Sequence, residues 1–147
     1  MRMPGQWLLC ADGFTRPVVW ATVLGHDGEP VADRFLIDSG ADVTVFSADL
    51  RVELDLPTKA PPPQDTLVGI GGGNPYVMVS AVLELAQIDG GPVRVRGDYR
   101  AFLDVAATDM SILGRDVLAN FDVILSRRRN EVVLLAGNSR YSIATGP

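Results

Sequence analysis

The chain has 147 residues, of which 47% are hydrophobic and 21% charged, and its net charge at pH 7 is −5. This length supports one domain with a sizeable core, and the acidic balance argues against a nucleic-acid partner. No apolar window is long enough to span a membrane or to form a secretory signal, and the single cysteine, Cys10, cannot form an intramolecular disulfide, so we expect a cytoplasmic protein.

The pattern of the first residues differs from that of the rest of the chain. Residues 1–16 are broken by prolines and glycines, and only residues 7–10 are compatible with a short strand. Cys10, at the end of that segment, has no neighbouring histidine or basic cluster and is interpreted as a small, partly buried apolar residue. We therefore expect residues 1–16 to be an N-terminal extension and residues 17–147 to form the domain.

A β-hairpin is predicted next. Residues 18–24 and 31–37 are rich in β-branched and apolar side chains, and the segment between them is rich in glycine and proline. His26 lies in this turn, where we expect it to be exposed. Because it is the one histidine of the chain, chemistry based on a Ser-His-Asp or Cys-His arrangement is disfavoured.

The hairpin delivers an aspartate to the end of a strand. The apolar run that ends at Ile37 is followed by the sequence Asp38-Ser39-Gly40-Ala41-Asp42, and a second apolar run begins at Val43. A strand end fixes the backbone of such a residue while its carboxylate faces away from the core. Asp-Ser-Gly alone also occurs in ordinary turns, but the flanking strands favour a functional carboxylate.

A short helix and a glycine-rich hairpin are predicted after this loop. Ser47 is a plausible N-cap for a helix over residues 48–54, and the three prolines of residues 61–63 favour an extended, exposed connection. An apolar strand that starts at residue 66 then enters a tip that contains Gly69, Ile70, Gly71, Gly72 and Gly73, and a long strand over 77–85 leaves it. No Lys-Ser/Thr pair and no helix follow these glycines, so a phosphate-binding or dinucleotide-binding loop is disfavoured and a hairpin is predicted.

The last third of the chain is predicted to contain more strands and a second motif. Residues 93–96 alternate as a half-exposed strand, and residues 99–105 are the expected partner. The motif Ile112-Leu113-Gly114-Arg115-Asp116 then leads into a helix expected from Val117 to residue 120 or 121.

Two or three strands are expected at the end of the chain. Residues 121–126 and 131–135 are apolar strand patterns joined by an arginine-rich turn, which we interpret as solvated. A last strand is compatible with residues 139–145.

The Asp38 segment and the motif at Ile112 resemble the two signatures of the retropepsin-like, or retroviral-type, aspartic peptidase family, over roughly residues 18–135. The resemblance implies an all-β, single-domain acid-protease barrel with one or two short helices, acting as a homodimer without cofactor or metal. It implies that Asp38 is catalytic and that Arg115 pairs with Asp42. It further implies an active-site loop supported by Ser39, Gly40, Ala41, Asp42 and Arg115, a second motif at Ile112, Leu113 and Gly114, and a flap over the substrate formed by Gly69, Ile70, Gly71, Gly72 and Gly73.

Aspartic peptide hydrolysis uses two adjacent carboxyl groups that share one proton, which favours mildly acidic conditions. The chain contains one Asp-Ser/Thr-Gly, so the second carboxylate would be Asp38 of another subunit. Aspartic endopeptidase activity is therefore the leading prediction. Two alternatives are a retropepsin-like dimerisation or peptide-binding module with weak or no hydrolysis, and a metal site at Asp33, Asp38 and Asp42, which lacks the dense carboxylate spacing of a calcium loop.

Overall fold

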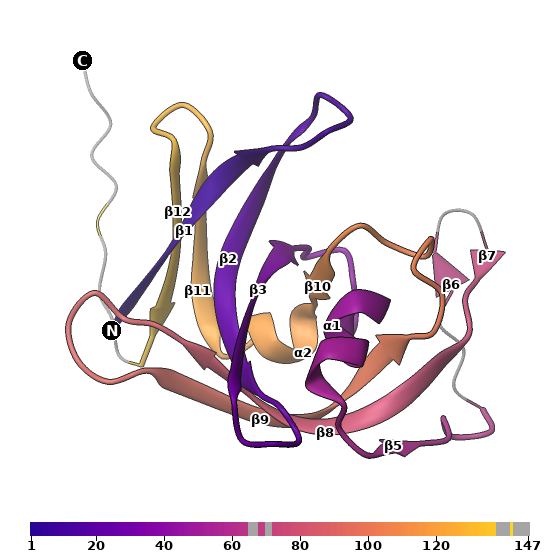
Figure 1. Ribbon diagram of the computed structural model, residues 1–147. Helices are drawn as coiled ribbons and strands as arrows, with labels where there is room; N and C mark the ends of the chain where they lie inside the picture. Colours follow the sequence, from indigo (N-terminus) through magenta and orange to yellow (C-terminus); the bar gives the residue numbers. More distant parts are fainter. Residues whose placement is uncertain (65–67, 70–71, 138–141, 143–147) are drawn as a thin grey trace.

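The computed structural model describes residues 1–64, 68–69, 72–137 and 142. Most of its regular structure is strand (Figure 1). In chain order the elements are β1 (Arg2–Leu9), β2 (Thr15–Leu24), β3 (Pro30–Ile37), β4 (Val45–Phe46), α1 (Ala48–Leu54), β5 (Thr58–Lys59), β6 (Val68–Gly69), β7 (Gly72–Gly73), β8 (Tyr76–Leu85), β9 (Val93–Phe102), β10 (Ser111–Leu113), α2 (Arg115–Leu118), β11 (Phe121–Ser126) and β12 (Glu131–Ala136).

Six of these strands close into a barrel. They follow one another in the order β2-β3-β10-β4-β9-β8, and β2 also pairs with β8, which completes the ring. The β3–β10 and β4–β9 pairs are parallel, and the other pairs of the ring are antiparallel. Closure leaves no free edge within the ring. The all-β architecture predicted from the sequence is confirmed.

The barrel is filled by aromatic and aliphatic side chains. Phe46 lies at the centre of an aromatic cluster, with its ring 5.8 Å from that of Phe35 and 5.3 Å from that of Tyr99. Leu83 and Leu113, from β8 and β10, are fully buried in the same core. Burying such side chains contributes roughly 1.5–3 kcal/mol each, so this core fixes the strands on which the loops below depend.

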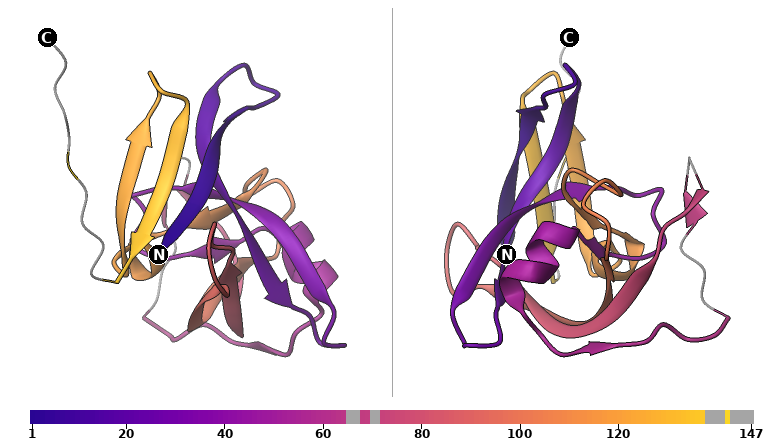
Figure 2. Two further views of the ribbon diagram at one scale, coloured as in Figure 1. Left: turned by 90° about the vertical axis from the view of Figure 1, so that its left-hand side faces the viewer. Right: turned by 45° about the vertical axis from the view of Figure 1, so that its right-hand side comes forward.

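Strand β1 joins a second sheet to the barrel. Its first half pairs with β12 and its second half pairs with β2, so the order β11-β12-β1-β2 continues into the ring (Figures 1 and 2). Gly5 lies where β1 changes partners. A Cβ atom there would lie 2.4 Å from the Val18 carbonyl oxygen and 2.6 Å from a methyl group of Val132. The strand expected over residues 7–10 therefore begins earlier, at Arg2, because the glycine that indicated a break in fact permits this close approach.

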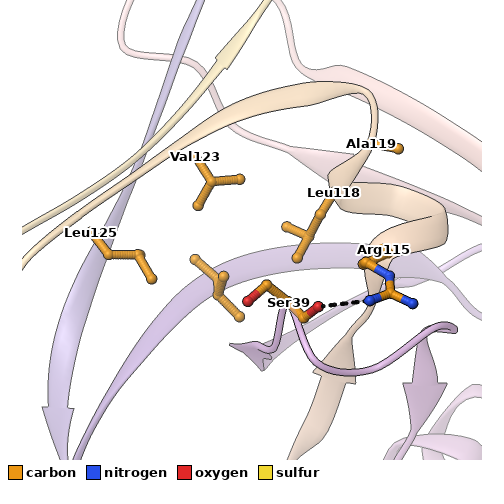
Figure 3. A pocket seen from close by; sticks show the side chains of 7 residues that line it. Ser39, Arg115, Leu118, Ala119, Val123 and Leu125 are labelled. Carbon is orange, nitrogen blue, oxygen red and sulfur yellow. Dashed lines mark hydrogen bonds between the residues drawn. The ribbon is translucent and has the colours of Figure 1, made fainter.

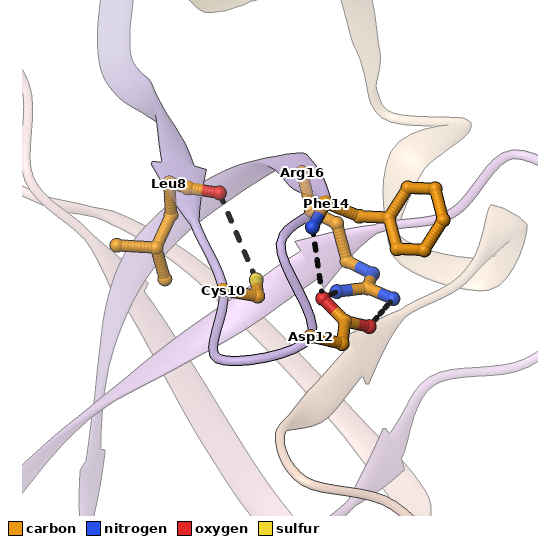
Figure 4. A network of polar contacts seen from close by, with 5 residues as sticks. All are labelled: Leu8, Cys10, Asp12, Phe14 and Arg16. Carbon is orange, nitrogen blue, oxygen red and sulfur yellow. Dashed lines mark hydrogen bonds and ion pairs between the residues drawn. The ribbon is translucent and has the colours of Figure 1, made fainter.

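Side chains organise the turn between β1 and β2 (Figure 4). The Arg16 guanidinium donates to both carboxylate oxygens of Asp12, and the backbone N–H of Phe14 donates to one of them at 3.0 Å. The hydrogen bonds from Arg16, followed by that from Phe14, lower the pKa of Asp12 to about 2. Cys10 is half-buried beside this turn, as expected, and its Sγ lies 3.7 Å from the Leu8 carbonyl oxygen.

Two elements differ from those predicted, and a third lies almost entirely outside the described residues. Residues 93–102 form one continuous strand, β9, which pairs with β8 along its whole length, so the expected partnership of 93–96 with 99–105 is wrong. Helix α2 ends at Leu118, because the chain turns into β11 at Phe121. The strand proposed over 139–145 lies outside the described residues, apart from residue 142, which belongs to no strand.

Two local predictions are confirmed. Ser47 caps α1, its side-chain oxygen accepting from the Leu50 N–H. His26 is exposed in the β2–β3 turn. In the part of the chain that the structure describes, no helix is long and apolar enough to cross a membrane.

The buried hydroxyl of Tyr99 should make the stability of the core depend on pH in alkaline solution. Burial, with a smaller contribution from the charge of Asp116, raises the pKa of Tyr99 to about 12, and its hydroxyl donates to the Val95 carbonyl oxygen at 2.9 Å. An unfolded tyrosine ionises near pH 10, so the stability associated with the neutral phenol is present below about pH 10 and is lost as the pH rises towards 12. We expect Tyr99→Phe to lower the free energy of unfolding at neutral pH by about 1 kcal/mol and to flatten its alkaline decline, as measured by urea titrations between neutral and strongly alkaline pH. An equally steep decline in the variant would contradict this assignment.

Candidate active site

Asp38 directly follows β3, and backbone hydrogen bonds hold its position. Its N–H donates to the Leu113 carbonyl oxygen at 3.1 Å, which extends the parallel β3–β10 pairing by one residue. Its carbonyl oxygen accepts from the Ala41 N–H at 3.1 Å, and one carboxylate oxygen accepts from the Gly40 N–H at 2.9 Å. Asp38 is half-buried, whereas Ser39 and Gly40 are exposed. The loop therefore presents a fixed carboxylate at the surface.

The second motif packs against this loop through its backbone. A Cβ atom on Gly114 would lie 2.3 Å from the carbonyl carbon of Val43 and 2.4 Å from its oxygen, so only glycine fits there without a shift of the backbone. The next two residues donate back to the Asp38 loop: the Arg115 N–H to the Ala41 oxygen at 2.8 Å and the Asp116 N–H to the Asp42 oxygen at 3.2 Å. The two segments, about 70 residues apart in sequence, thus form one unit.

The predicted pair between Arg115 and Asp42 is present. The guanidinium of Arg115 contacts a carboxylate oxygen of Asp42 and also donates to the Ser39 carbonyl oxygen at 3.4 Å. Both charged side chains are more than half exposed. An exposed pair contributes at most about 1 kcal/mol, so it orients the loop more than it stabilises the fold.

Thr44 is a supporting residue that the sequence analysis did not identify. Its hydroxyl is fully buried; it accepts from the Gly114 N–H at 3.0 Å and donates to a carboxylate oxygen of Asp116 at 2.7 Å. The same carboxylate oxygen accepts from the Val117 N–H at 2.9 Å, at the start of α2. The sequence contains one indication of this role, which is that Thr44 is a polar residue within the apolar run from Val43. The high β-propensity of threonine would also explain its presence in a strand.

The glycine-rich segment contains a short hairpin. β6 pairs with β7, with Val68 opposite Gly73 and Gly69 opposite Gly72. This hairpin stands out from the barrel at the start of β8 (Figure 2). Ile70 and Gly71, predicted to form its tip, lie outside the described residues, and the role of the hairpin as a flap stays a prediction.

An apolar groove adjoins the Asp38 loop. It has a volume of about 550 Å³, and Ser39 and Arg115 form its polar rim (Figure 3). The remaining lining residues are apolar: Ile37, Leu118, Ala119, Val123 and Leu125. Asp38 does not line this groove, so the space is not the predicted position of a scissile bond.

The aspartates considered for a metal site have other partners. Asp33 accepts from the Ser111 hydroxyl at 2.9 Å, and Asp42 pairs with Arg115. Among residues 1–64, 68–69, 72–137 and 142, no three His, Cys, Asp or Glu side chains are grouped so that they could hold a metal ion.

The barrel, together with an Asp-Ser-Gly loop braced by a second glycine motif, defines the retropepsin-like class of aspartic protease folds. A retropepsin-like aspartic protease from Rickettsia conorii has 14% sequence identity to this chain and a TM-score of 0.59; the match covers 91% of this chain and 89% of that one. The EIAV protease, solved in complex with the inhibitor HBY-793, has 19% identity and a TM-score of 0.53, and the match covers 71% of this chain and 86% of that one. At these identities the likeness is one of fold.

The family is shown by sequence. The model of the aspartyl protease family matches residues 21–117, a span that includes the Asp38 loop, the glycine-rich hairpin and the second motif. The chain therefore belongs to the aspartyl protease family. None of the curated protein sequences matches it significantly.

The contact at Gly114 is tested by Gly114→Ala, because the added methyl group would overlap the Val43 backbone. We expect the free energy of unfolding to fall by about 3 kcal/mol. Gly91→Ala is the matched control: no atom lies within 4 Å of its added methyl group, so its effect should stay within about 1 kcal/mol. Thermal and urea unfolding of both variants measure the difference, and equal stabilities would contradict the tight approach.

Proposed function

We propose that this protein is an aspartic endopeptidase whose catalytic dyad consists of Asp38 from two subunits. The observation that carries the proposal is the position of Asp38, half-buried at the end of β3, with its backbone and one carboxylate oxygen held by hydrogen bonds from neighbouring residues. Membership of the aspartyl protease family supports the general activity. Ser39, Gly40, Ala41, Asp42 and Arg115 would support the loop.

The chemistry requires two carboxyl groups in different protonation states. The ionised carboxylate takes a proton from a water molecule, whose oxygen forms a bond to the scissile carbonyl carbon. The protonated carboxyl group donates to the carbonyl oxygen, and when the C–N bond breaks a proton passes to the leaving nitrogen. Each chain supplies one Asp-Ser-Gly loop, so an isologous homodimer with both Asp38 loops at its two-fold axis completes the dyad.

A substrate peptide would lie extended between the Asp38 loops and the glycine-rich hairpins. The β6–β7 hairpin precedes β8 and projects from the barrel, as a flap would. An extended peptide can pair with exposed strand edges, which gives affinity through its main chain. The inhibitor named with the EIAV protease shows that a neighbour of this fold holds a ligand; we propose that this chain holds peptides.

A binding module without hydrolysis is the second candidate. One subunit carries half of a dyad, and a dimer that kept the Asp38 loops apart would bind peptides without cleaving them.

The cytoplasmic location expected from the single cysteine stays a prediction.

The test is cleavage of a mixed peptide library between about pH 3 and 7, comparing wild type with Asp38→Asn at several protein concentrations. We expect Asp38→Asn to lower the rate at least about 100-fold, because the variant can neither activate water nor donate a proton as the carboxyl group does. The rate of the wild type should rise more than linearly with concentration in dilute solution. Asp89→Asn, an exposed loop substitution, serves as the control and should keep full activity.

The same experiment separates the two candidates. A wild type that is shown to dimerise and yet is as inert as Asp38→Asn would rule out the peptidase and leave the binding module.

A further inference from the structure

Two β-turns lie at the same end of the molecule. The β1–β2 and β11–β12 hairpins project from the barrel in the same direction (Figures 1 and 2). Trp7, half-buried, connects the two hairpins. Its indole N–H donates to the Glu131 carbonyl oxygen at 3.1 Å, and the Arg127 guanidinium lies 5.8 Å from the centre of its ring. Residues 9–14 and 127–130 are called the hairpin end below.

The β11–β12 turn is strongly basic. It contains three consecutive arginines, residues 127–129, and all three are exposed. The acidic groups nearby are already neutralised, since Glu131 forms an ion pair with Arg2 at 2.8 Å and Asp12 forms one with Arg16. Among the described residues, none of the three arginines takes part in an ion pair. A local charge of +3 therefore stands on a chain whose net charge is −5.

The β1–β2 turn adds exposed apolar side chains to this end. Leu9 is 70% exposed and Phe14 is 68% exposed, the highest values among the large hydrophobic residues of the described part of the chain. The Arg16 guanidinium lies 5.8 Å from the centre of the Phe14 ring, and its charge is balanced by Asp12 (Figure 4). The hairpin end thus presents uncompensated cations and apolar side chains on projecting turns.

We propose that the hairpin end binds the surface of a membrane that contains anionic phospholipids. Leu9 and Phe14 insert between the lipid headgroups, and the arginines of residues 127–129 bind lipid phosphates, with which guanidinium groups form strong hydrogen bonds. Surface segments bind membranes through this combination of buried apolar area and attraction to anionic lipids. The inference concerns where the protein resides and does not depend on the proposed peptidase activity.

The charge distribution determines the orientation on such a surface. Without the +3 of residues 127–129, the rest of the chain carries a net charge of −8 and is repelled by anionic lipid, so the approach with the hairpin end forward is the attractive one. A membrane is an extended plane and can contact both turns at once. Leu9 favours lipid over a nucleic acid, because an aliphatic side chain cannot stack on bases as an aromatic ring does.

This proposal changes the interpretation of the arginine-rich turn. From the sequence alone the turn is interpreted as solvated, since nothing among its neighbours in the sequence indicates an apolar surface nearby. The structure places Leu9 and Phe14, from the other end of the chain, at the same end of the molecule.

Sedimentation with vesicles tests the basic turn. The protein is mixed with sucrose-loaded vesicles of phosphatidylcholine, with or without phosphatidylserine, at about 0.1 M salt. We expect binding to the vesicles that contain phosphatidylserine. Each arginine near an anionic surface contributes roughly fivefold to the partition coefficient. The combined variant Arg127→Gln, Arg128→Gln and Arg129→Gln should therefore lower the partition coefficient on the order of 100-fold.

The matched control removes the same charge from the barrel strands β3 and β9. It combines substitutions at three exposed positions, Arg34→Gln, Arg94→Gln and Arg96→Gln. Because charges far from the surface are screened, it should lower the partition coefficient less than about threefold. Circular dichroism with thermal unfolding checks that both variants fold.

A second measurement tests the insertion of the apolar side chains. In a Cys10→Ser background, Phe14→Cys is labelled with an environment-sensitive fluorophore. We expect its emission to shift to shorter wavelength when vesicles with phosphatidylserine are added. Val52→Cys, at a position 64% exposed on α1, is the matched control and should show no shift. If the two labels respond alike, the insertion of this turn is wrong.

Other partners for this end give different outcomes. A wild type that binds RNA or acidic peptides but not the vesicles overturns the membrane proposal, as does an equal loss of binding in the two arginine variants. A second copy of the chain could also cover Leu9, so analytical ultracentrifugation of Leu9→Gln is required. A weakened dimer with unchanged vesicle binding would assign Leu9 to a contact between subunits and overturn the proposal. Asp38→Asn should bind vesicles as the wild type does, which keeps this result separate from that on peptidase activity.

Discussion

The approach of Gly114 to the backbone at Val43 is the contact on which the rest of the site depends. Strand β10 runs between β3 and β4, and the chain that leaves it crosses the Asp38 loop at a distance that a side chain would prevent. At this distance the buried hydroxyl of Thr44 reaches the Gly114 N–H. A buried backbone donor without a partner would cost about 1–3 kcal/mol, so the glycine and the threonine are needed together.

The Asp38 loop is held mainly by backbone hydrogen bonds, and its charged side chains contribute less. Asp38 donates to Leu113, and Ala41 and Asp42 accept from the N–H groups of Arg115 and Asp116. These bonds hold whatever the ionic strength, whereas the exposed pair between Arg115 and Asp42 is weakened by salt. Among the described residues, the Asp38 carboxylate takes part in no ion pair. Under the proposed function this suits a group that exchanges protons with water.

The sequence contained enough information for the local features and too little for the long-range ones. Asp38 at a strand end and the Ser47 cap follow from patterns within about ten residues of each other, where turn and capping chemistry decide. The role of Thr44 and the continuity of β9 depend on residues far away in the sequence, Gly114 in one case and the whole of β8 in the other. Judged from its sequence neighbours alone, Gly5 indicates a break in the strand. Nothing in those neighbours shows that Val18 and Val132 lie in close contact with it.

Under the proposed function, the Asp38 loop has one requirement that its own chain cannot meet. A single carboxylate cannot be base and acid at the same moment, so the chemistry needs a second copy of the loop. The free energy of dimerisation would be the free energy that brings the two loops together. The concentration of the protein would then determine what fraction carries a complete site, and dilution alone would separate the carboxylates.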